Sequence, residues 1–193
     1  TNKGKGIVMS DPQTQQDIIK QLEIIQVGVA NDIEKLSDAQ FNTGSEVAWS
    51  AADYLKHLLL SLKPLSKVFV FPATRLRSQF GTAERPSRVY SEVVTVYQKR
   101  LDEGARAEDY EKVVPAFYRF PEGINDPQSY LVQSWNDTNQ RLIEAIQAWT
   151  EAELDSLQIP HPAIGMTTLR EMLFFTIFHN TLHWHDIQHA GGL

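Results

Sequence analysis

The segment 167–190, TTLREMLFFTIFHNTLHWHDIQHA, constrains the fold more than any other part of the chain. It reads as one helix of about six turns and carries four of the six histidines. Thr168 and Glu171 have the spacing of a capping box, in which a hydroxyl and a carboxylate satisfy the first free N–H groups. Gly191 and Gly192 follow, and glycine readily takes the left-handed conformation that ends helices. We therefore expect a long C-terminal helix.

Two histidines of this helix lie in the middle of its apolar face. At about 100° per residue, His179 and His183 fall about 40° apart, and Asp186 lies on the same side. Two imidazoles left unpaired in a core cost about 1–3 kcal/mol each. A divalent metal ion satisfies both, because side chains at i and i+4 converge at ligand distance. The pattern predicts a metal site, which a third imidazole from another helix would complete while leaving one coordination position open.

Two known kinds of metal site do not fit this pattern. The zinc-protease motif needs a glutamate directly after its first histidine, and Asn180 stands there. Carboxylate-bridged di-iron bundles need Glu-x-x-His motifs, and the sequence contains none. Of the other histidines, His185 and His189 are expected to face solvent. His161, between two prolines, is expected in a loop with no visible partner.

Composition narrows the class of protein. The chain has 193 residues, 42% hydrophobic and 22% charged, which is typical of a single soluble globular domain. A net charge of −6 without a basic tract argues against a nucleic acid partner. The absence of cysteine excludes disulfides, thiolate ligands and a thiol nucleophile. No apolar run is long enough to span a membrane. We expect a cytoplasmic protein, with residues 1–10 as a loose N-terminal tail.

Helical periodicity recurs along the rest of the chain, and no strand alternation accompanies it. The fold class is therefore all-α, an antiparallel bundle with one extra helix. We expect a turn-rich connection over 41–47, a kink or an early end of the second helix at Pro64, and loops over 72–85 and 104–126. Asn139 falls within an apolar stripe, so we expect its amide to be hydrogen-bonded inside the bundle or to line a pocket. The helices are expected over residues 11–36, 51–71, 86–103 and 127–149, ahead of the last one.

His57 is the one histidine of the second helix. It lies on the flank of the leucine stripe, so its position alone leaves two readings open. One is a histidine at a helix–helix seam that is hydrogen-bonded to a carbonyl group, which is common. The other is the third metal ligand.

The sequence resembles the DinB/YfiT-like superfamily of bacterial metal-dependent four-helix bundles. The resemblance rests on WSAADYLKHLL (49–59) and TTLREMLFFTIFHNTLHWHDIQH (167–189). It implies that His57, His179 and His183 bind Zn²⁺ or Ni²⁺. The usual glutamine three residues after the last ligand is here Asp186. Residues 72–126 contain no motif that matches the family.

The resemblance also implies an up-down-down-up bundle spanning residues 1–193, with one additional helix and a long loop between the second and fourth helices, frequently as a homodimer. Characterised relatives transfer low-molecular-weight thiols such as bacillithiol or mycothiol, or isomerise substrates with their help.

Two kinds of function follow. The first is an enzyme that binds a small-molecule substrate, in a pocket between the second, fourth and last helices that residues 104–126 close. Its metal would activate a thiol or, as the alternative, water for hydrolysis. Asp53, Asp186 and Asn139 are the candidate partners of the ligands. The second is a non-catalytic, stress-related metal-binding bundle, which a fourth protein ligand or the lack of a pocket would favour.

Overall fold

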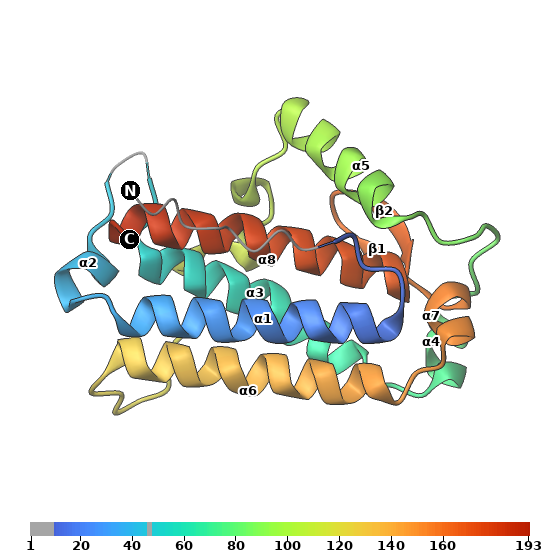
Figure 1. The fold of residues 1–193 in the computed structure, drawn as a ribbon, viewed down its shortest axis with the longest axis horizontal. Helices are drawn as coiled ribbons and strands as arrows, with labels where there is room; N and C mark the ends of the chain where they lie inside the picture. The colour runs from blue at the N-terminus through green and yellow to red at the C-terminus, as the bar shows by residue number, and fades with distance from the viewer. Residues whose placement is uncertain (1–9, 46–47) are drawn as a thin grey trace.

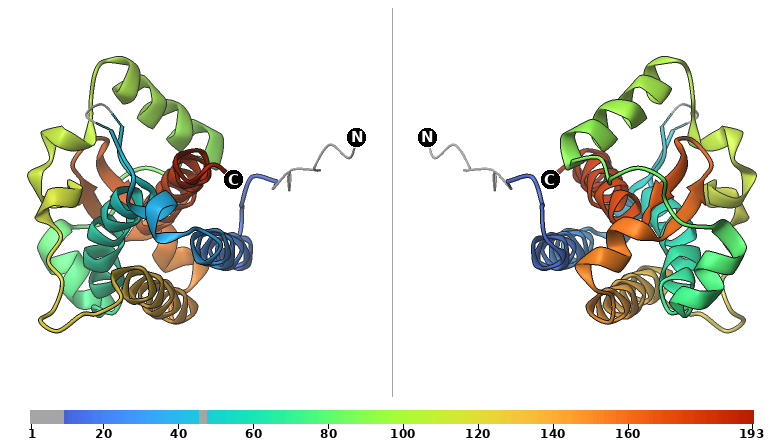
Figure 2. Two further views of the ribbon diagram at one scale, coloured as in Figure 1. Left: turned by 90° about the vertical axis from the view of Figure 1, so that its left-hand side faces the viewer. Right: turned by 90° about the vertical axis from the view of Figure 1, so that its right-hand side faces the viewer.

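Four long helices form a bundle with up-down-down-up topology, as expected. The computed structural model describes residues 10–45 and 48–193, so most of the expected N-terminal tail and two residues of the 41–47 connection lie outside the described part. Each long helix packs against two others, in the cyclic order α1, α6, α3, α8 (Figures 1 and 2). Helices α1 and α8 point one way, and α3 and α6 point the other (Figure 1). The bounds are α1 Gln15–Glu34, α3 Ala51–Val68, α6 Pro127–Gln147 and α8 Leu169–Gly191.

Capping side chains decide where these helices begin. Ser50 and Thr168 each accept the backbone N–H of the residue three positions on at 3.1 Å, which confirms the predicted starts of α3 and α8. The first helix was expected to begin at residue 11. It begins instead after Thr14, whose side chain caps it in a complete capping box. This hydroxyl satisfies a free N–H group that a proline start leaves open.

Helix α3 does not end at Pro64 but runs on to Val68. Ser66 and Phe69, beyond the proline, are buried against the bundle. Proline removes one backbone hydrogen bond and favours an early end. The packing of these later side chains outweighs that loss, because most helix stability in proteins comes from tertiary contacts.

Several short elements lie outside the bundle. One of them lies within residues 72–85, which we expected to form a loop. This element, helix α4, has no side-chain cap but buries Leu76 completely. The predicted helix 86–103 begins at residue 90 and packs against α8 as the additional helix (Figure 2). The short elements are α2 Asp38–Asn42, α4 Ala73–Phe80, α5 Tyr90–Asp102, α7 Glu151–Ser156 and the 3-10 helices Ala107–Asp109, Glu111–Val113 and Pro115–Phe117.

Ion pairs fasten the segment before α5 to the first turn of α8. Glu171 is completely buried and binds the guanidinium groups of Arg85 and Arg88. Burial by itself raises the pKa of this carboxyl group, yet hydrogen bonds from the two arginines lower it to about 2. Glu171 therefore does more than complete the predicted capping box, because it also fixes where the chain enters α5.

A two-stranded hairpin, β1 (Gln158–His161) and β2 (Gly165–Thr168), leads into α8 and corrects the expectation that the chain contains no strand. The strands are antiparallel, with His161 opposite Gly165. Gly165 has φ +76°, a backbone conformation that glycine adopts without strain. Strands of four residues, one of which contains a proline, are too short to show a detectable alternation. The amide of Gln158 donates to the carbonyl of Phe80 at 2.8 Å, so tertiary contacts hold the hairpin.

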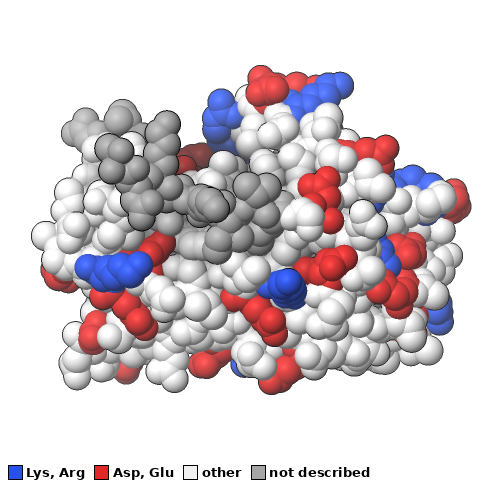
Figure 3. Space-filling view, in the orientation of Figure 1, with Lys and Arg blue, Asp and Glu red and all other residues white. Residues whose placement is uncertain are grey.

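The surface formed mainly by α1 and α6 carries acidic side chains interspersed with a few basic ones, and no basic patch is visible among the coloured atoms of that view (Figure 3). Within the described residues, no helix combines the length and the apolar character that crossing a membrane requires.

Candidate metal centre

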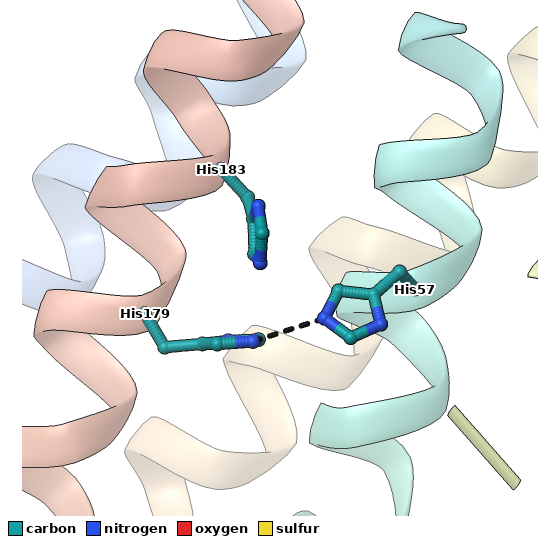
Figure 4. Close-up of side chains that lie close together, drawn as sticks. All are labelled: His57, His179 and His183. Carbon is teal, nitrogen blue, oxygen red and sulfur yellow. Dashed lines mark hydrogen bonds between the residues drawn. The ribbon is translucent and has the colours of Figure 1, made fainter. Parts of the chain in front are cut away.

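Three histidines from two helices converge between α3 and α8 (Figure 4). His57 comes from α3, and His179 and His183 come from α8. One ring nitrogen of each lies within 4.8 Å of the others. The Nε2 atoms of His57 and His179 are 3.0 Å apart. The predicted pair, His179 and His183, therefore has a third imidazole beside it. This imidazole belongs to His57, whose direction could not be decided from the helical wheel.

The outer nitrogens of these rings are held by hydrogen bonds. The Nδ1 of His57 lies 2.8 Å from the carbonyl oxygen of Val113, and the Nδ1 of His183 lies 2.8 Å from a carboxylate oxygen of Asp186. Carbonyl and carboxylate oxygens only accept, so both Nδ1 atoms carry the proton. Each Nε2 therefore turns a lone pair toward the cluster. His57 is thus bonded to a carbonyl group, as the first reading expected, and it also lies in the histidine cluster, where the second reading requires it.

Burial keeps His57 and His179 neutral near pH 7. Burial, then the proximity of His183, lowers the pKa of His57 to about 4, and a backbone hydrogen bond opposes the shift only weakly. Burial and the two neighbouring histidines hold the pKa of His179 well below its usual value. The Nδ1 of His179 lies 3.4 Å from the side-chain oxygen of Asn180, which only accepts, so the Nε2 of His179 also turns a lone pair toward the cluster. Three imidazole nitrogens that face one another in this way are the donor set that a divalent cation binds. The cluster fits a divalent metal ion.

Of the three residues expected to contact the histidines, Asp186, Asp53 and Asn139, one does so. Asp186 touches His183, as predicted. Asp53 does not reach a histidine: its carboxylate accepts from Ser50 and from Lys56 at 3.0 Å, because it completes the cap of α3. The N–H group of His57 that Asp53 was expected to accept goes to a backbone carbonyl of the 104–126 segment instead.

Asn139 is buried in the bundle, and its Nδ2 donates to the carbonyl of Trp135 at 2.9 Å. This confirms the expected internal hydrogen bond. The bond is made one turn back on the same helix, α6, which does not line the cavity beside the histidines. Asn139 is therefore not a partner of the cluster, which corrects that assignment.

A cavity of about 910 Å³ adjoins the three histidines. Its walls come from α3, α5, α8, the hairpin and part of residues 101–113, whereas we expected α6, the fourth helix, to form one side. The additional helix α5 takes that place. Of the 104–126 segment, which we expected to close the pocket, residues between 105 and 113 line the cavity. Most of the wall is apolar and aromatic, including Tyr54, Leu60, Leu65, Tyr97, Val113 and Phe175.

His161, expected in a loop without a partner, lines this cavity. Its ring centroid lies 4.1 Å from that of Phe175, which in turn stacks on His179 at 5.2 Å. Its position at the end of β1 depends on the hairpin, so the sequence offered no signal for it. His185 and His189 are exposed, as expected.

Replacing Asp186 with asparagine should weaken metal binding about 10- to 100-fold, the usual effect of losing a carboxylate that orients a ligand histidine. The physical reason is the 2.8 Å bond that fixes the proton of His183 on Nδ1. Competition with a chromogenic chelator measures the affinity. Asp53→Asn is the control, and an equal loss in both variants would mean that Asp186 has no specific role.

Stability of the chelator-treated protein should fall as the pH drops from 7 to 5, in part through His161. Burial lowers the pKa of this histidine to about 4, from the usual 6.5. In the unfolded chain His161 binds a proton near pH 6.5, whereas in the folded chain it stays unprotonated until about pH 4. Acid therefore favours unfolding. The His161 contribution is about 2 kcal/mol over that interval. His161→Asn should unfold with a shallower pH dependence in urea titrations, and an unchanged slope would contradict this.

The fold and the histidine cluster define the class: an up-down-down-up four-helix bundle with a site suited to a divalent metal. The chain belongs to the DinB superfamily, whose family model matches residues 21–187. Its structure is similar to that of YfiT from Bacillus subtilis, with a TM-score of 0.59 and 16% identity over 95% of this chain and 93% of that chain. YfiT is described as a probable metal-dependent hydrolase with an unusual four-helix bundle topology. At this identity the likeness shows the fold. No curated protein matches the sequence.

Proposed function

We propose that this protein is a metal-dependent enzyme in which His57, His179 and His183 hold one divalent ion, Zn²⁺ or Ni²⁺. The observation that carries the proposal is the position of the histidines in the wall of a cavity of about 910 Å³. Among the described residues, no fourth His, Asp or Glu atom joins the cluster. Three protein ligands and an open side are typical of catalytic sites, whereas structural sites are closed. The arrangement thus favours catalysis over the non-catalytic alternative.

The described residues of the cavity offer no activated nucleophile of their own. The hydroxyl groups of Ser61 and Thr176 donate to backbone carbonyls at 3.0 and 2.8 Å. Burial raises the pKa of Tyr97, and burial together with nearby carboxylates raises that of Tyr54, so both phenols stay protonated. The chain has no cysteine. No hydroxyl or thiol group of the protein is therefore activated there, and we expect the nucleophile to come from outside the protein.

A divalent ion at the cluster would supply that chemistry, because a cation stabilises the anion of a bound thiol or water. We favour a low-molecular-weight thiol, transferred to an electrophilic small molecule or used in an isomerisation. The size of the cavity supports this choice, because ligand sites usually measure about 300–1,000 Å³, and this one can hold a thiol beside an apolar electrophile. The protein would position both reactants and exclude water with its aromatic wall.

Hydrolysis is the second candidate. The description of YfiT as a probable metal-dependent hydrolase favours it, and water needs no further residue for activation. Assays of the metal-loaded protein separate the two: a chlorinated aromatic electrophile with a panel of thiols, and esters and amides without thiol. We expect turnover only with thiol and metal together, and none in His179→Ala. Ester turnover without thiol would establish the hydrolase, and no turnover with either would favour the non-catalytic reading.

A further inference from the structure

The side chain of His161 is fixed in one tautomer by the turn of the hairpin. Its Nδ1 lies 3.1 Å from the backbone nitrogen of Ala163 and 3.3 Å from that of Ile164. Both of these groups are N–H donors, so Nδ1 must be the acceptor. The guanidinium group of Arg100 holds the same turn by donating to the carbonyl of Ala163 at 3.1 Å. A neutral imidazole with an unprotonated Nδ1 carries its hydrogen on Nε2.

The Nε2–H group of His161 reaches the cavity. Among the described residues, Asn180 Nδ2 is the one side-chain nitrogen or oxygen that is both buried and without a partner. No described residue forms a hydrogen bond with the Nε2 of His161, which is not among the fully buried atoms without a partner and so reaches open space, and the residue lines the cavity. The ring of Phe175 separates it from His179. The cavity therefore has a hydrogen-bond donor one aromatic ring away from the three histidines.

We propose that His161 is a substrate-binding residue, which donates its Nε2–H to an uncharged acceptor oxygen of a largely apolar substrate, such as a carbonyl oxygen. The apolar wall would take the rest of that molecule, and the hydrogen bond would fix its orientation along the line from His161 to the histidine cluster. In apolar pockets, a small number of precisely placed polar groups determines the orientation of the ligand.

Charge decides which acceptor fits. Burial keeps the pKa of His161 near 4, so the ring donates without carrying a positive charge at neutral pH. The ionisable groups around the cavity include three carboxylates, of Asp102, Glu108 and Asp186, and one guanidinium group, that of Arg106. In the metal-free protein, a carboxylate ligand would meet this net negative lining without a cationic partner at His161. A neutral carbonyl compound is therefore preferred over its anionic counterpart.

Two substitutions separate this role from the folding of the hairpin. In His161→Asn, the side-chain oxygen takes the place of Nδ1 and keeps accepting from the turn, while the donor at Nε2 is lost. In His161→Gln, the amide group extends to the position of Nε2 and restores a donor there. The probes are a phenyl ketone and the alkene of the same shape that lacks the oxygen, with benzoate as the anionic comparison. Calorimetry measures the binding of the ketone and the alkene to the metal-loaded protein. It compares the ketone with benzoate in the chelator-treated protein, where no ion can bind the carboxylate.

The wild-type protein should bind the ketone about 3- to 10-fold more tightly than the alkene, the effect of one neutral hydrogen bond. In the metal-free protein, the ketone should also bind more tightly than benzoate. The preference for the ketone should disappear in His161→Asn and return in part in His161→Gln. Equal binding of ketone and alkene to the wild type, a preference that survives in His161→Asn, or no binding of either probe would overturn the proposal.

Nitrogen-15 NMR of histidine-labelled protein gives a readout independent of ligands. The Nε2 of His161 should be protonated and its Nδ1 should not, and the opposite tautomer would overturn the assignment. The role of His161 rests on the proposed function in one respect, which is that a substrate is expected to react at the histidine cluster. Binding and NMR require no turnover, so His161 can be assigned correctly even if the assays for thiol transfer fail.

Discussion

His183→Ala should purify without metal, whereas the wild-type protein should hold about one equivalent of a divalent ion per chain. His183 supplies one of three converging ring nitrogens, and three ligands are the minimum seen at protein zinc sites with an open position. Losing a residue that merely orients a ligand already costs about 10- to 100-fold in affinity, so losing the ligand itself should cost more. Elemental analysis after dialysis against metal-free buffer measures the content.

His185→Ala is the matched control for this experiment. It removes the same side chain from the same helix, two residues further on, where the histidine is exposed. Both variants place alanine, the best helix former, within α8. Circular dichroism should therefore show the same helix content in both. Full metal content in His183→Ala would show that the three histidines do not form the site.

Removal of the ion should destabilise the fold by about 4 kcal/mol when the free metal stands at 1,000 times its dissociation constant, since a ligand bound only to the native state stabilises it by RT ln(1 + [L]/Kd). For a chain of this length, that corresponds to a fall of about 8–16 °C in Tm. The physical reason is that the ion would tie α3 to α8, and the unfolded chain does not hold the three nitrogens together.

The measurement compares thermal unfolding with and without a chelator, after analysis has verified that the metal is gone. His179→Ala should unfold at the same temperature in both buffers, because its site is already broken. If the wild type also showed no shift, tight binding to the native state would be ruled out, and the cavity would then have to work without a resident ion.

The long helices were predictable because their signals are local. Capping residues lie three positions apart, and apolar stripes repeat every three to four residues. These rules located α3, α6 and α8 within a few residues and predicted the α5 helix. They failed for α4 and the hairpin, where Leu76 and Gln158 depend on contacts with distant residues. No local pattern records such contacts.

The candidate site likewise contains residues that local sequence places together and residues that only tertiary packing brings in. His179, His183 and Asp186 lie on one helix, so 3.6-residue periodicity alone brings them to one side, and the sequence by itself determined that they would meet. His57 joins them only because α3 packs beside α8, and its hydrogen bond to Val113 joins residues 56 positions apart in the chain. His161 reaches the cavity only through the hairpin, and α5 rather than α6 forms the wall. Those placements depend on how the helices pack in three dimensions, which only the tertiary structure decides.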